Sequence, residues 1–434
     1  MILHTVAPGE TLTSIGREYG LAPGLIARYN GLPPPYTLAV GQSLLLLFPS
    51  VLHMVREGET LWQIARQYDT DPLLLLRCNP NLSGVPRLYP GQVLVISFTD
   101  EPSRSAQCLG YAYPFARESV LRGILPYDTW FSPFTFGITA EGGLIDLSVK
   151  NLLTIAGQYG NAALLHLSTL TETGGFSSDR AAQVLGSAGL QERLINEVAR
   201  RVQEGGYAGA DVDFEFLPAP YADAYAEFLA TLRDRLHEQG CVLFAALAPK
   251  TSTGQKGLLY EGHSYAKIGA SVDAVLLMTY EWGYTFGPAG SVAPLDQVRR
   301  VLSYALTEIP ADKIFLGFPN YAYDWTLPFR AGESRARSIS NPEAAELAAR
   351  YGAEIRFDER SATPHFNYTL FGAVHEVWFE DPRSAQAKFA LLGEFGLRGV
   401  GFWNFMRPFP AGFSLLNAMY VLTPGTDAAS ALLP

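Results

Sequence analysis

Three carboxylic acids alternate with apolar residues in one short stretch of the sequence, 211–216. On a β-strand, residues two apart share a face, so we expect Asp211, Asp213 and Glu215 to point to the same side of a sheet. The apolar residues between them should face the other side and pack under helices; they are Val212, Phe214 and Phe216. Crowded acids that are shielded from water repel one another, so at least one keeps its proton near neutral pH. That is the condition for a general acid, and Glu215, seconded by Asp213, is the candidate.

The acidic stretch belongs to a series of apolar, strand-like segments that alternate with amphipathic, helix-like ones. The strand-like segments are 109–114, 129–136, 163–168, 210–216, 242–248, 274–280, 314–319 and 399–405. Helix-like segments lie between them at 148–158, 179–204, 222–238, 295–306 and 384–394. This alternation over residues 108–434 predicts an α/β fold, a (β/α)₈ TIM barrel with the acids on its fourth strand.

Residues 326–381 interrupt the alternation, because they are too many for a connection between the seventh and eighth strands. They contain strand-like runs near 353–357 and 376–379. We therefore expect a small inserted α+β subdomain. In a TIM barrel the reacting groups lie on the loops that follow the strands, so this insertion would wall one side of the cleft.

An internal repeat precedes the barrel. His4 and the Gly9-Glu10-Thr11-Leu12 stretch recur in the same register as His53 and Gly58-Glu59-Thr60-Leu61. Each copy predicts a short strand, a turn whose Thr caps a helix, a second helix and a closing strand. We expect two βααβ domains at 1–49 and 51–98, followed by a polar linker at 99–107.

The two copies resemble the lysin motif (LysM), which binds N-acetylglucosamine polymers in peptidoglycan or chitin. The resemblance implies that glycan is bound by the turn residues Gly58, Glu59, Thr60 and Leu61, and by Gly9 and Thr11 in the first copy. The first copy departs from the pattern, because a proline run at 32–36 replaces the usual Asn-Pro stretch. The alternative is that the repeats are spacers or protein-docking modules. Two linked copies favour a polymeric ligand, since weak sites that are joined gain avidity.

The barrel resembles family 18 glycoside hydrolases, whose fourth strand carries an Asp-x-x-Asp-x-Asp-x-Glu signature. Asp211, Asp213 and Glu215 match it, whereas Ala208 stands where the family has its first Asp. Two further stretches match family landmarks: Met278-Thr279-Tyr280 at the end of the sixth strand, and Phe402-Trp403 on the eighth. Within the family, the stretches 280–283 and 321–325 look most like LysM-bearing spore cortex-lytic N-acetylglucosaminidases.

The resemblance implies substrate-assisted retention, in which the acetamido oxygen of the sugar attacks the anomeric carbon. Glu215 would then be the acid, Asp213 would stabilise the acetamido nitrogen, and Tyr280 would position the acetamido oxygen. Asp211 would support Asp213, and Trp403 would form an apolar floor for the sugar ring. Six further residues are candidates to shape the cleft, although each could equally be structural: Glu281, Trp282, Asn320, Tyr321, Asp324 and Trp325.

Other chemistries find less support. A hard-cation site at the carboxylate strand is the alternative there, but no His spacing suits a metal, and we expect neither a metal nor a cofactor. The formal charge of −10 disfavours nucleic acid as a partner. No apolar run predicts membrane insertion and no classical signal peptide is apparent. The odd number of cysteines, Cys78, Cys108 and Cys241, predicts reduced, buried thiols.

The leading hypothesis is a peptidoglycan hydrolase, acting on the spore cortex and cutting after N-acetylglucosamine. It implies a protein associated with the spore cortex, the coat or the cell wall. Two alternatives stay open: a chitinase, and a lectin-like glycan-binding protein that has lost its chemistry. The retained Glu215 argues against the lectin.

Overall fold

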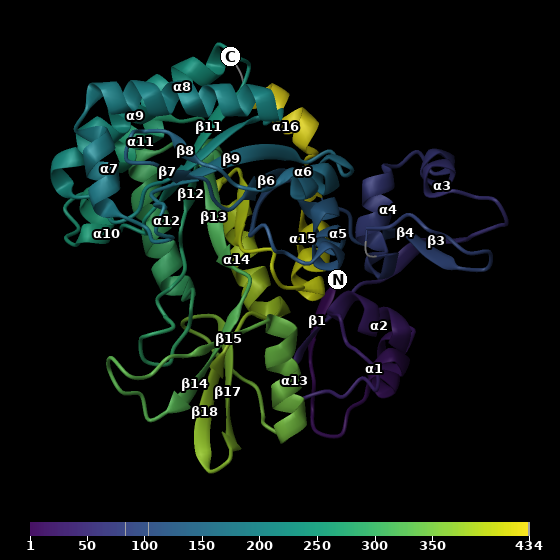
Figure 1. Ribbon diagram of the computed structural model, residues 1–434. Coiled ribbons are helices and arrows are strands. Elements are labelled where there is room, and N and C mark those ends of the chain that lie inside the picture. The colour runs from purple at the N-terminus through teal and green to yellow at the C-terminus, as the bar shows by residue number, and fades with distance from the viewer. Residues whose placement is uncertain (83, 103, 433–434) are drawn as a thin grey trace.

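The computed structural model describes residues 1–82, 84–102 and 104–432. Along the chain, two small modules precede a barrel, and a sheet with its own helix is inserted before the last strand of the barrel (Figure 1). Among these described residues, no helix is both long enough and apolar enough to cross a membrane.

The two modules repeat one architecture, as the sequence repeat predicts. The first consists of β1 (Ile2–Thr5), α1 (Leu12–Tyr19), α2 (Pro23–Asn30) and β2 (Ser43–Leu46). The second consists of β3 (Pro49–Met54), α3 (Leu61–Gln67), α4 (Pro72–Cys78), the 3₁₀ turn η1 (Pro80–Leu82) and β4 (Val93–Phe98). In each module the two strands pair antiparallel.

A buried asparagine links the second helix of each module to its closing strand. The Asn30 side-chain amide donates to the carbonyls of Ile26 and Leu45, and its oxygen accepts from the Leu45 amide, all at 2.8 Å. Asn79 makes the equivalent bonds in the second module, with Leu75 and Val95. Because a buried amide must satisfy its donors and acceptor, this residue determines how helix and strand pack.

Eight parallel strands close into the predicted barrel. In order they are β5 (Ser105–Ala112), β6 (Trp130–Pro133), β9 (Ala162–Ser168), β10 (Gly209–Asp213), β11 (Val242–Leu247), β12 (Ala274–Leu277), β13 (Ile314–Pro319) and β19 (Gly399–Trp403). The barrel closes because β19 pairs with β5. A short strand, β20 (Val421–Leu422), also lies against β5.

Helices surround the barrel. They are α5 (Glu118–Ile124), α6 (Lys150–Gly157), α7 (Ser178–Leu185), α8 (Ala188–Gly205), α9 (Ala222–His237), α10 (Leu258–Glu261), α11 (Tyr265–Ser271), α12 (Leu295–Glu308), α14 (Pro382–Phe395), α15 (Pro410–Met419) and α16 (Gly425–Leu432). Short elements complete the connections: η2 (Leu125–Tyr127), β7 (Gly137–Ile138), β8 (Leu144–Ile145), η3 (Ala219–Tyr221) and η4 (Ala311–Lys313). The single helix expected over 179–204 is wrong, because the chain breaks at Gly186 and Ser187 into α7 and α8.

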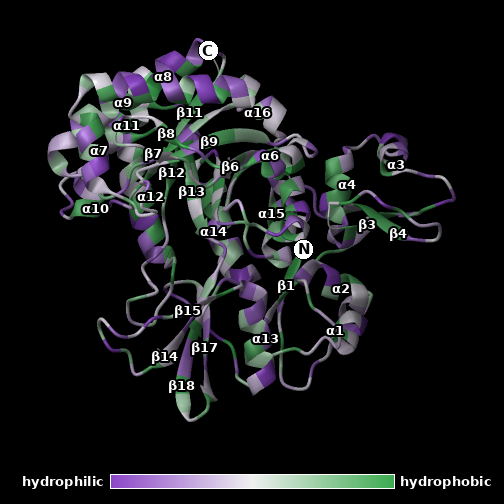
Figure 2. Cartoon of the chain, in the orientation of Figure 1, coloured by the Kyte–Doolittle hydropathy of each residue, from purple (hydrophilic) through white to green (hydrophobic). Residues whose placement is uncertain are grey.

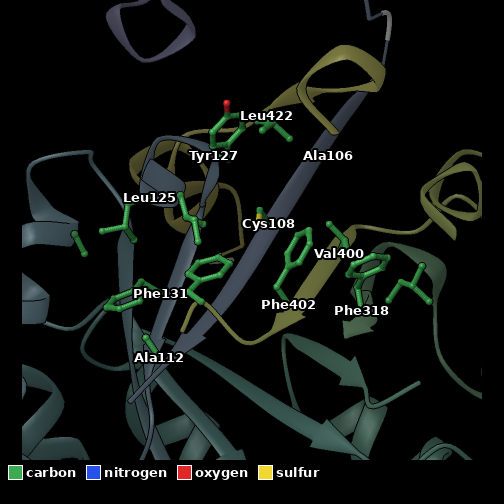
Figure 3. Close-up of a cluster of buried hydrophobic side chains, with 14 of the residues drawn as sticks. Ala106, Cys108, Ala112, Leu125, Tyr127, Phe131, Phe318, Val400, Phe402 and Leu422 are labelled. Carbon is green, nitrogen blue, oxygen red and sulfur yellow. The ribbon is translucent and has the colours of Figure 1, made fainter. Parts of the chain in front are cut away.

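The core has an inner and an outer layer. Large side chains such as Trp130, Phe244 and Phe315 fill the barrel interior. The outer layer lies between strands and helices, and Figure 3 shows part of it, with Phe131 from β6, Phe318 from β13 and Phe402 from β19. In Figure 2 the central strands are largely hydrophobic, whereas α8 and α13 alternate hydrophobic and hydrophilic residues. The three cysteines are buried free thiols, as predicted.

The insertion is a five-stranded antiparallel sheet in the order β15-β14-β18-β17-β16. Its elements are β14 (Ala322–Leu327), β15 (Arg337–Ile339), α13 (Asn341–Tyr351), β16 (Arg356–Asp358), β17 (Thr363–Leu370) and β18 (Ala373–Trp378). The sheet starts earlier than the expected residue 326, almost directly after β13. It therefore rises from the carboxyl end of the barrel, the end on which a TIM barrel carries its active site.

Both modules are docked on the rest of the chain. In the first, the Val40 carbonyl accepts from the Ile355 amide of the insertion at 2.9 Å. In the second, Arg77 donates to the Pro126 carbonyl at 3.1 Å, and the Tyr127 hydroxyl donates to the Arg77 carbonyl at 2.9 Å. The linker is shorter than the expected 99–107, because β5 already begins at Ser105.

A buried ion pair ties the end of the insertion to the barrel, and it generates a stability prediction. Lys388 of α14 contacts both oxygens of Glu380, at 2.8 and 2.9 Å, and each side chain is only 1% exposed. Lys388→Met leaves a buried carboxylate without its cation, which typically costs about 3–5 kcal/mol. We expect the melting temperature, measured by calorimetry, to fall by roughly 3–5 °C.

The matched control is Lys256→Met. Lys256 pairs with Glu261 at 3.2 Å but is 87% exposed, and surface pairs contribute about 1 kcal/mol or less. Equal shifts for the two variants would contradict the stabilising role of the buried pair.

Candidate active site

The acidic stretch lies at the carboxyl end of β10, between β9 and β11. Asp211 and Asp213 are buried toward the barrel interior, where Ser132 of β6 donates to an Asp211 oxygen at 3.0 Å. On the opposite face, Val212 and Phe214 are fully buried, and Phe214 stacks on aromatic rings of α9. The predicted alternation of faces therefore holds over 211–214.

The alternation of faces ends at Phe214, so the expectation that the strand continues to residue 216 is wrong. β10 stops at Asp213, so Glu215 lies in the loop beyond the strand, partly exposed at the mouth of the barrel. Phe216 has a φ of 52° and is 47% exposed, instead of packing under the helices. The left-handed turn at Phe216 carries the chain away from the sheet, which places Glu215 where a substrate can reach it.

Burial determines the protonation of these acids. Burial raises the pKa of Asp211 to about 6, although the nearby hydroxyls of Tyr111 and Ser132 act against the shift. Burial, followed by the charges of Glu215 and Asp211, raises the pKa of Asp213 well above its usual range. Within the described chain, one oxygen of Asp211 and one of Asp213 have no hydrogen-bond partner. The group can therefore hold protons near neutral pH and still offer Asp213 to a ligand.

Glu215 is affected by the same burial and by another acid from a different loop. Burial, and then the charge of Glu281, raises the pKa of Glu215. The Glu281 carboxylate accepts hydrogen bonds from the hydroxyls of Tyr321 and Tyr323, the latter at 3.0 Å. Glu281 has a φ of 69°, so the backbone makes a left-handed turn directly after Tyr280. The chain thus places a fourth carboxyl group near the acid, and only the tertiary structure brings it there.

Neighbouring strands contribute inward-facing polar residues that sequence reasoning missed. In the register of the sheet, Asp211 lies opposite His166 and Asp213 opposite Ser168, both on β9. His166 Nε2 lies 3.9 Å from Asp213, and burial lowers the pKa of His166 to about 3, so the imidazole is neutral. His166 and Ser168 are two residues apart and therefore lie on the same inward face of β9. Pairing β9 with β10 in the correct register would have identified them.

Tyr280 and Trp403 lie at the same end of the barrel as the acids. Tyr280 follows β12, and burial together with the charges of Asp213 and Glu215 raises its pKa well above its usual range. Trp403 ends β19, and its ring centroid lies 4.9 Å from Phe134 and 5.8 Å from Tyr111. Both aromatic residues therefore lie at the end of the barrel that carries the acids.

The insertion forms one wall of the site. Tyr321, Tyr323 and Trp325 share a cluster with Val292 and Ala336, and Tyr280 and Trp403 pack against that cluster. Trp282, in the loop after β12, is 36% exposed at the same rim.

Two of the expected cleft residues have other contacts. The Asn320 amide donates to the carbonyls of Asn404 and Arg407, both at 2.9 Å, and so braces the loop after β19. Asp324 points to the other side of β14 from Tyr323, because neighbouring strand residues face opposite ways. There it accepts from Tyr368 at 2.8 Å and from His375 at 2.9 Å, in the interior of the insertion. The structure does not bring Asp324 to the acids.

Ala208, which stands where the family signature has its first Asp, packs against the apolar cluster inside the barrel. Among the residues that the structure describes, no group of three or more His, Cys, Asp or Glu is arranged to hold a metal ion.

The predicted glycan-binding residues of the modules have structural roles. Gly9 and Gly58 have φ of 84° and 80°, the left-handed turn that precedes each first helix. Thr11 and Thr60 cap those helices, and Leu61 is buried. Glu59 accepts from His53 at 2.9 Å and from the Arg56 amide at 2.7 Å. Their part in glycan binding stays a prediction.

Comparison with known proteins agrees with this geometry. Residues 149–407 match the model of glycosyl hydrolases family 18, and residues 4–46 and 53–97 match the LysM domain. The chain is 38% identical to the cortical fragment-lytic enzyme of Bacillus subtilis, over 97% of this chain and 98% of that protein. Its structure is similar to that of the Bacillus cereus spore cortex-lytic enzyme SleL, with a TM-score of 0.83, 34% identity, and coverage of 98% of this chain and 99% of that chain.

The spore cortex-lytic enzyme SleL of Bacillus megaterium is similar to the same degree, with a TM-score of 0.82, 34% identity, and coverage of 97% of this chain and 98% of that one. The family match, these relatives and the buried acids at the end of β10 lead to one conclusion. The chain is a glycoside hydrolase that belongs to glycosyl hydrolases family 18 and carries two N-terminal LysM domains.

Proposed function

We propose that this hydrolase cleaves peptidoglycan of the spore cortex at the glycosidic bond after N-acetylglucosamine, with retention of configuration. The observation that carries the proposal is the placement of Glu215 at the mouth of the barrel beside the buried Asp213, both with raised pKa. Relatives that match over nearly their full length are cortex-lytic enzymes, which supports the choice of polymer. The protein would accordingly act in the spore cortex or at the cell wall.

In the proposed reaction, the acetamido oxygen of the substrate attacks the anomeric carbon while the glycosidic bond breaks. Glu215 gives its proton to the departing oxygen, and an oxazolinium ion forms. Asp213, whose free oxygen has no protein partner among the described residues, hydrogen-bonds the acetamido N–H and stabilises the positive charge. The Glu215 carboxylate then takes a proton from a water molecule while the water oxygen attacks the anomeric carbon. This opens the oxazolinium ring and restores the acid.

Positioning falls to the aromatic residues around the acids. The Tyr280 hydroxyl donates a hydrogen bond to the acetamido oxygen and holds that oxygen in line for attack. Trp403 offers an apolar face to the sugar ring. Further rings are exposed on the loops that follow the barrel strands, which suits a polymeric substrate: Phe115, Phe176, Phe216 and Trp282. A chitinase would use the same site, since chitin contains the same sugar, and the polymer is decided by experiment.

The first test is Glu215→Gln. Reducing-sugar release from cortex fragments, intact peptidoglycan and chitin should fall by about 10²–10⁴-fold, because the amide cannot supply the proton. Glu238→Gln, at an exposed end of α9, is the matched control and should keep native turnover. Unchanged turnover by Glu215→Gln would remove this residue from the mechanism, and binding without any native turnover would favour the lectin.

The second test concerns Glu281→Gln. The negative charge of Glu281 raises the pKa of Glu215, so its removal lowers that pKa. Because Glu215 acts in its protonated form, the alkaline limb of kcat/KM should move to lower pH. Glu343→Gln, on α13, should leave the profile in place. An alkaline limb that stays where it is in Glu281→Gln would show that the two acids are not coupled.

A further inference from the structure

His263 is a buried histidine that the proposed reaction does not use. It follows α10, on the connection from β11 to α11, and its side chain is fully buried. Its Nε2 lies 2.9 Å from the carbonyl oxygen of Phe214, the residue directly before Glu215. His263 therefore connects the loop after β11 to the main chain beside the acid.

The Phe214 carbonyl needs this donor because the sheet ends just before it. β10 pairs with β11 only as far as Val212, which lies opposite Ala245, and the strand stops at Asp213. Phe214 is fully buried, and a buried carbonyl beyond the last strand pair must find another donor. The His263 imidazole supplies that N–H from the neighbouring loop.

The two partners of His263 determine which ring nitrogen carries the proton. Nδ1 lies 2.9 Å from the amide nitrogen of Ala248, and a backbone N–H can only donate, so Nδ1 is the acceptor. The proton is therefore on Nε2, where the Phe214 carbonyl accepts it. Burial lowers the pKa of His263 to about 4, so the ring is neutral near neutral pH and keeps both bonds.

Further buried hydrogen bonds hold the loop that carries His263. The Lys250 ammonium donates to the His263 carbonyl at 2.8 Å. The Tyr265 hydroxyl accepts from the Lys250 amide at 2.9 Å and donates to the Ala248 carbonyl at 2.6 Å. These bonds join the start of the loop to its end, so the imidazole is presented to Phe214 from a fixed position.

Gly262 contacts the chain on the other side of Glu215. A Cβ at Gly262 would lie 2.4 Å from the Leu217 carbonyl oxygen and 2.5 Å from the Leu217 Cβ, so the two main chains are in contact. Gly262 has a φ of −75°, which any residue adopts, so it is the close approach that requires glycine. Leu217 follows Glu215 by two residues and is fully buried.

We infer that Gly262 and His263 form a bracket that positions Glu215 for proton transfer. His263 is a positioning residue that holds the Phe214 carbonyl, and Gly262 allows Leu217 to approach. Between these two supports the chain makes the left-handed turn at Phe216, beside which Glu215 lies at the barrel mouth. The inference rests on the role proposed for Glu215.

The first test is His263→Leu, which removes both hydrogen bonds of the ring. On short soluble cortex fragments we expect kcat to fall by about 10²-fold, the loss that a misplacement of about 1 Å causes, with KM unchanged. Burial, and then the charge of Glu281, raises the pKa of Glu215. An acid that moves toward water loses part of this effect, so the alkaline limb of kcat/KM should also move to lower pH.

Two variants separate positioning from a loss of stability. His263→Gln has an amide with both a donor and an acceptor, and it should recover most of kcat and the native alkaline limb. Asn79→Leu is the matched control, because Asn79 also bridges backbone carbonyls and an amide, but in the second LysM domain. It should keep native kcat on soluble fragments at a temperature where all variants are folded.

Gly262→Ala keeps the test decisive if His263→Leu does not fold. The added Cβ forces Leu217 away, so kcat should fall with KM unchanged. Gly254→Ala, on the same loop, is its control, since a Cβ there has no atom within 4 Å, and it should have native kcat. Native kcat in Gly262→Ala would overturn the inference, as would equal losses in His263→Leu and His263→Gln with an unmoved alkaline limb.

Hydrogen exchange separates this inference from the proposed function, because it does not depend on catalysis. The amides of residues 214–217 should exchange faster in His263→Leu than in the native chain, and at the native rate in His263→Gln. An unchanged exchange rate in His263→Leu would refute the bracket. Unchanged turnover by Glu215→Gln would instead refute the role proposed for the acid, whatever the exchange rates are.

Discussion

The structure depends on carboxyl groups that are kept out of water inside the barrel. Removing an ionised carboxylate from water costs several kcal/mol unless it is paired, and the group responds by holding a proton. Asp211 and Asp213 are placed in this position by a strand whose neighbours on both sides belong to the closed sheet. Ser132 satisfies one oxygen of Asp211. The barrel thus creates the unfavourable environment that a general acid needs.

The insertion extends this environment through one strand. Because neighbouring residues of β14 face opposite sides, Tyr323 points to the site and supports Glu281, whereas Asp324 points to α13 and joins Tyr368 and His375. One strand therefore contributes to the interior of the inserted sheet and also holds Glu281, whose charge raises the pKa of Glu215. The insertion therefore forms one wall of the candidate active site.

The LysM domains are fixed on the catalytic body. Buried hydrogen bonds such as those between Arg77 and Pro126, and between Tyr127 and Arg77, join the second domain to the barrel. In the structure, the second LysM domain and the barrel that carries Glu215 are therefore packed together as one body.

The sequence by itself determined what depends on local periodicity. Strand alternation over 211–214, the repeat of the two domains and the succession of eight strands follow from backbone geometry, which acts within a few residues. The acids could be predicted from their alternation along one strand, whereas Tyr280 and Trp403 were predicted from the resemblance to family 18. The exposure of Phe216 could not, since it depends on where the sheet stops pairing with its neighbours.

Only the tertiary structure decided the contacts between distant segments. Glu281 meets Tyr323, 42 residues away, because closure of the barrel brings the loop after β12 to the first strand of the insertion. Sheet register places His166 opposite Asp211, where its Nε2 lies 3.9 Å from Asp213. The second LysM domain contacts the barrel through Tyr159, whose hydroxyl donates to the Gly84 carbonyl at 2.7 Å. Such contacts depend on how whole elements pack against one another, and no short-range pattern in the chain encodes that packing.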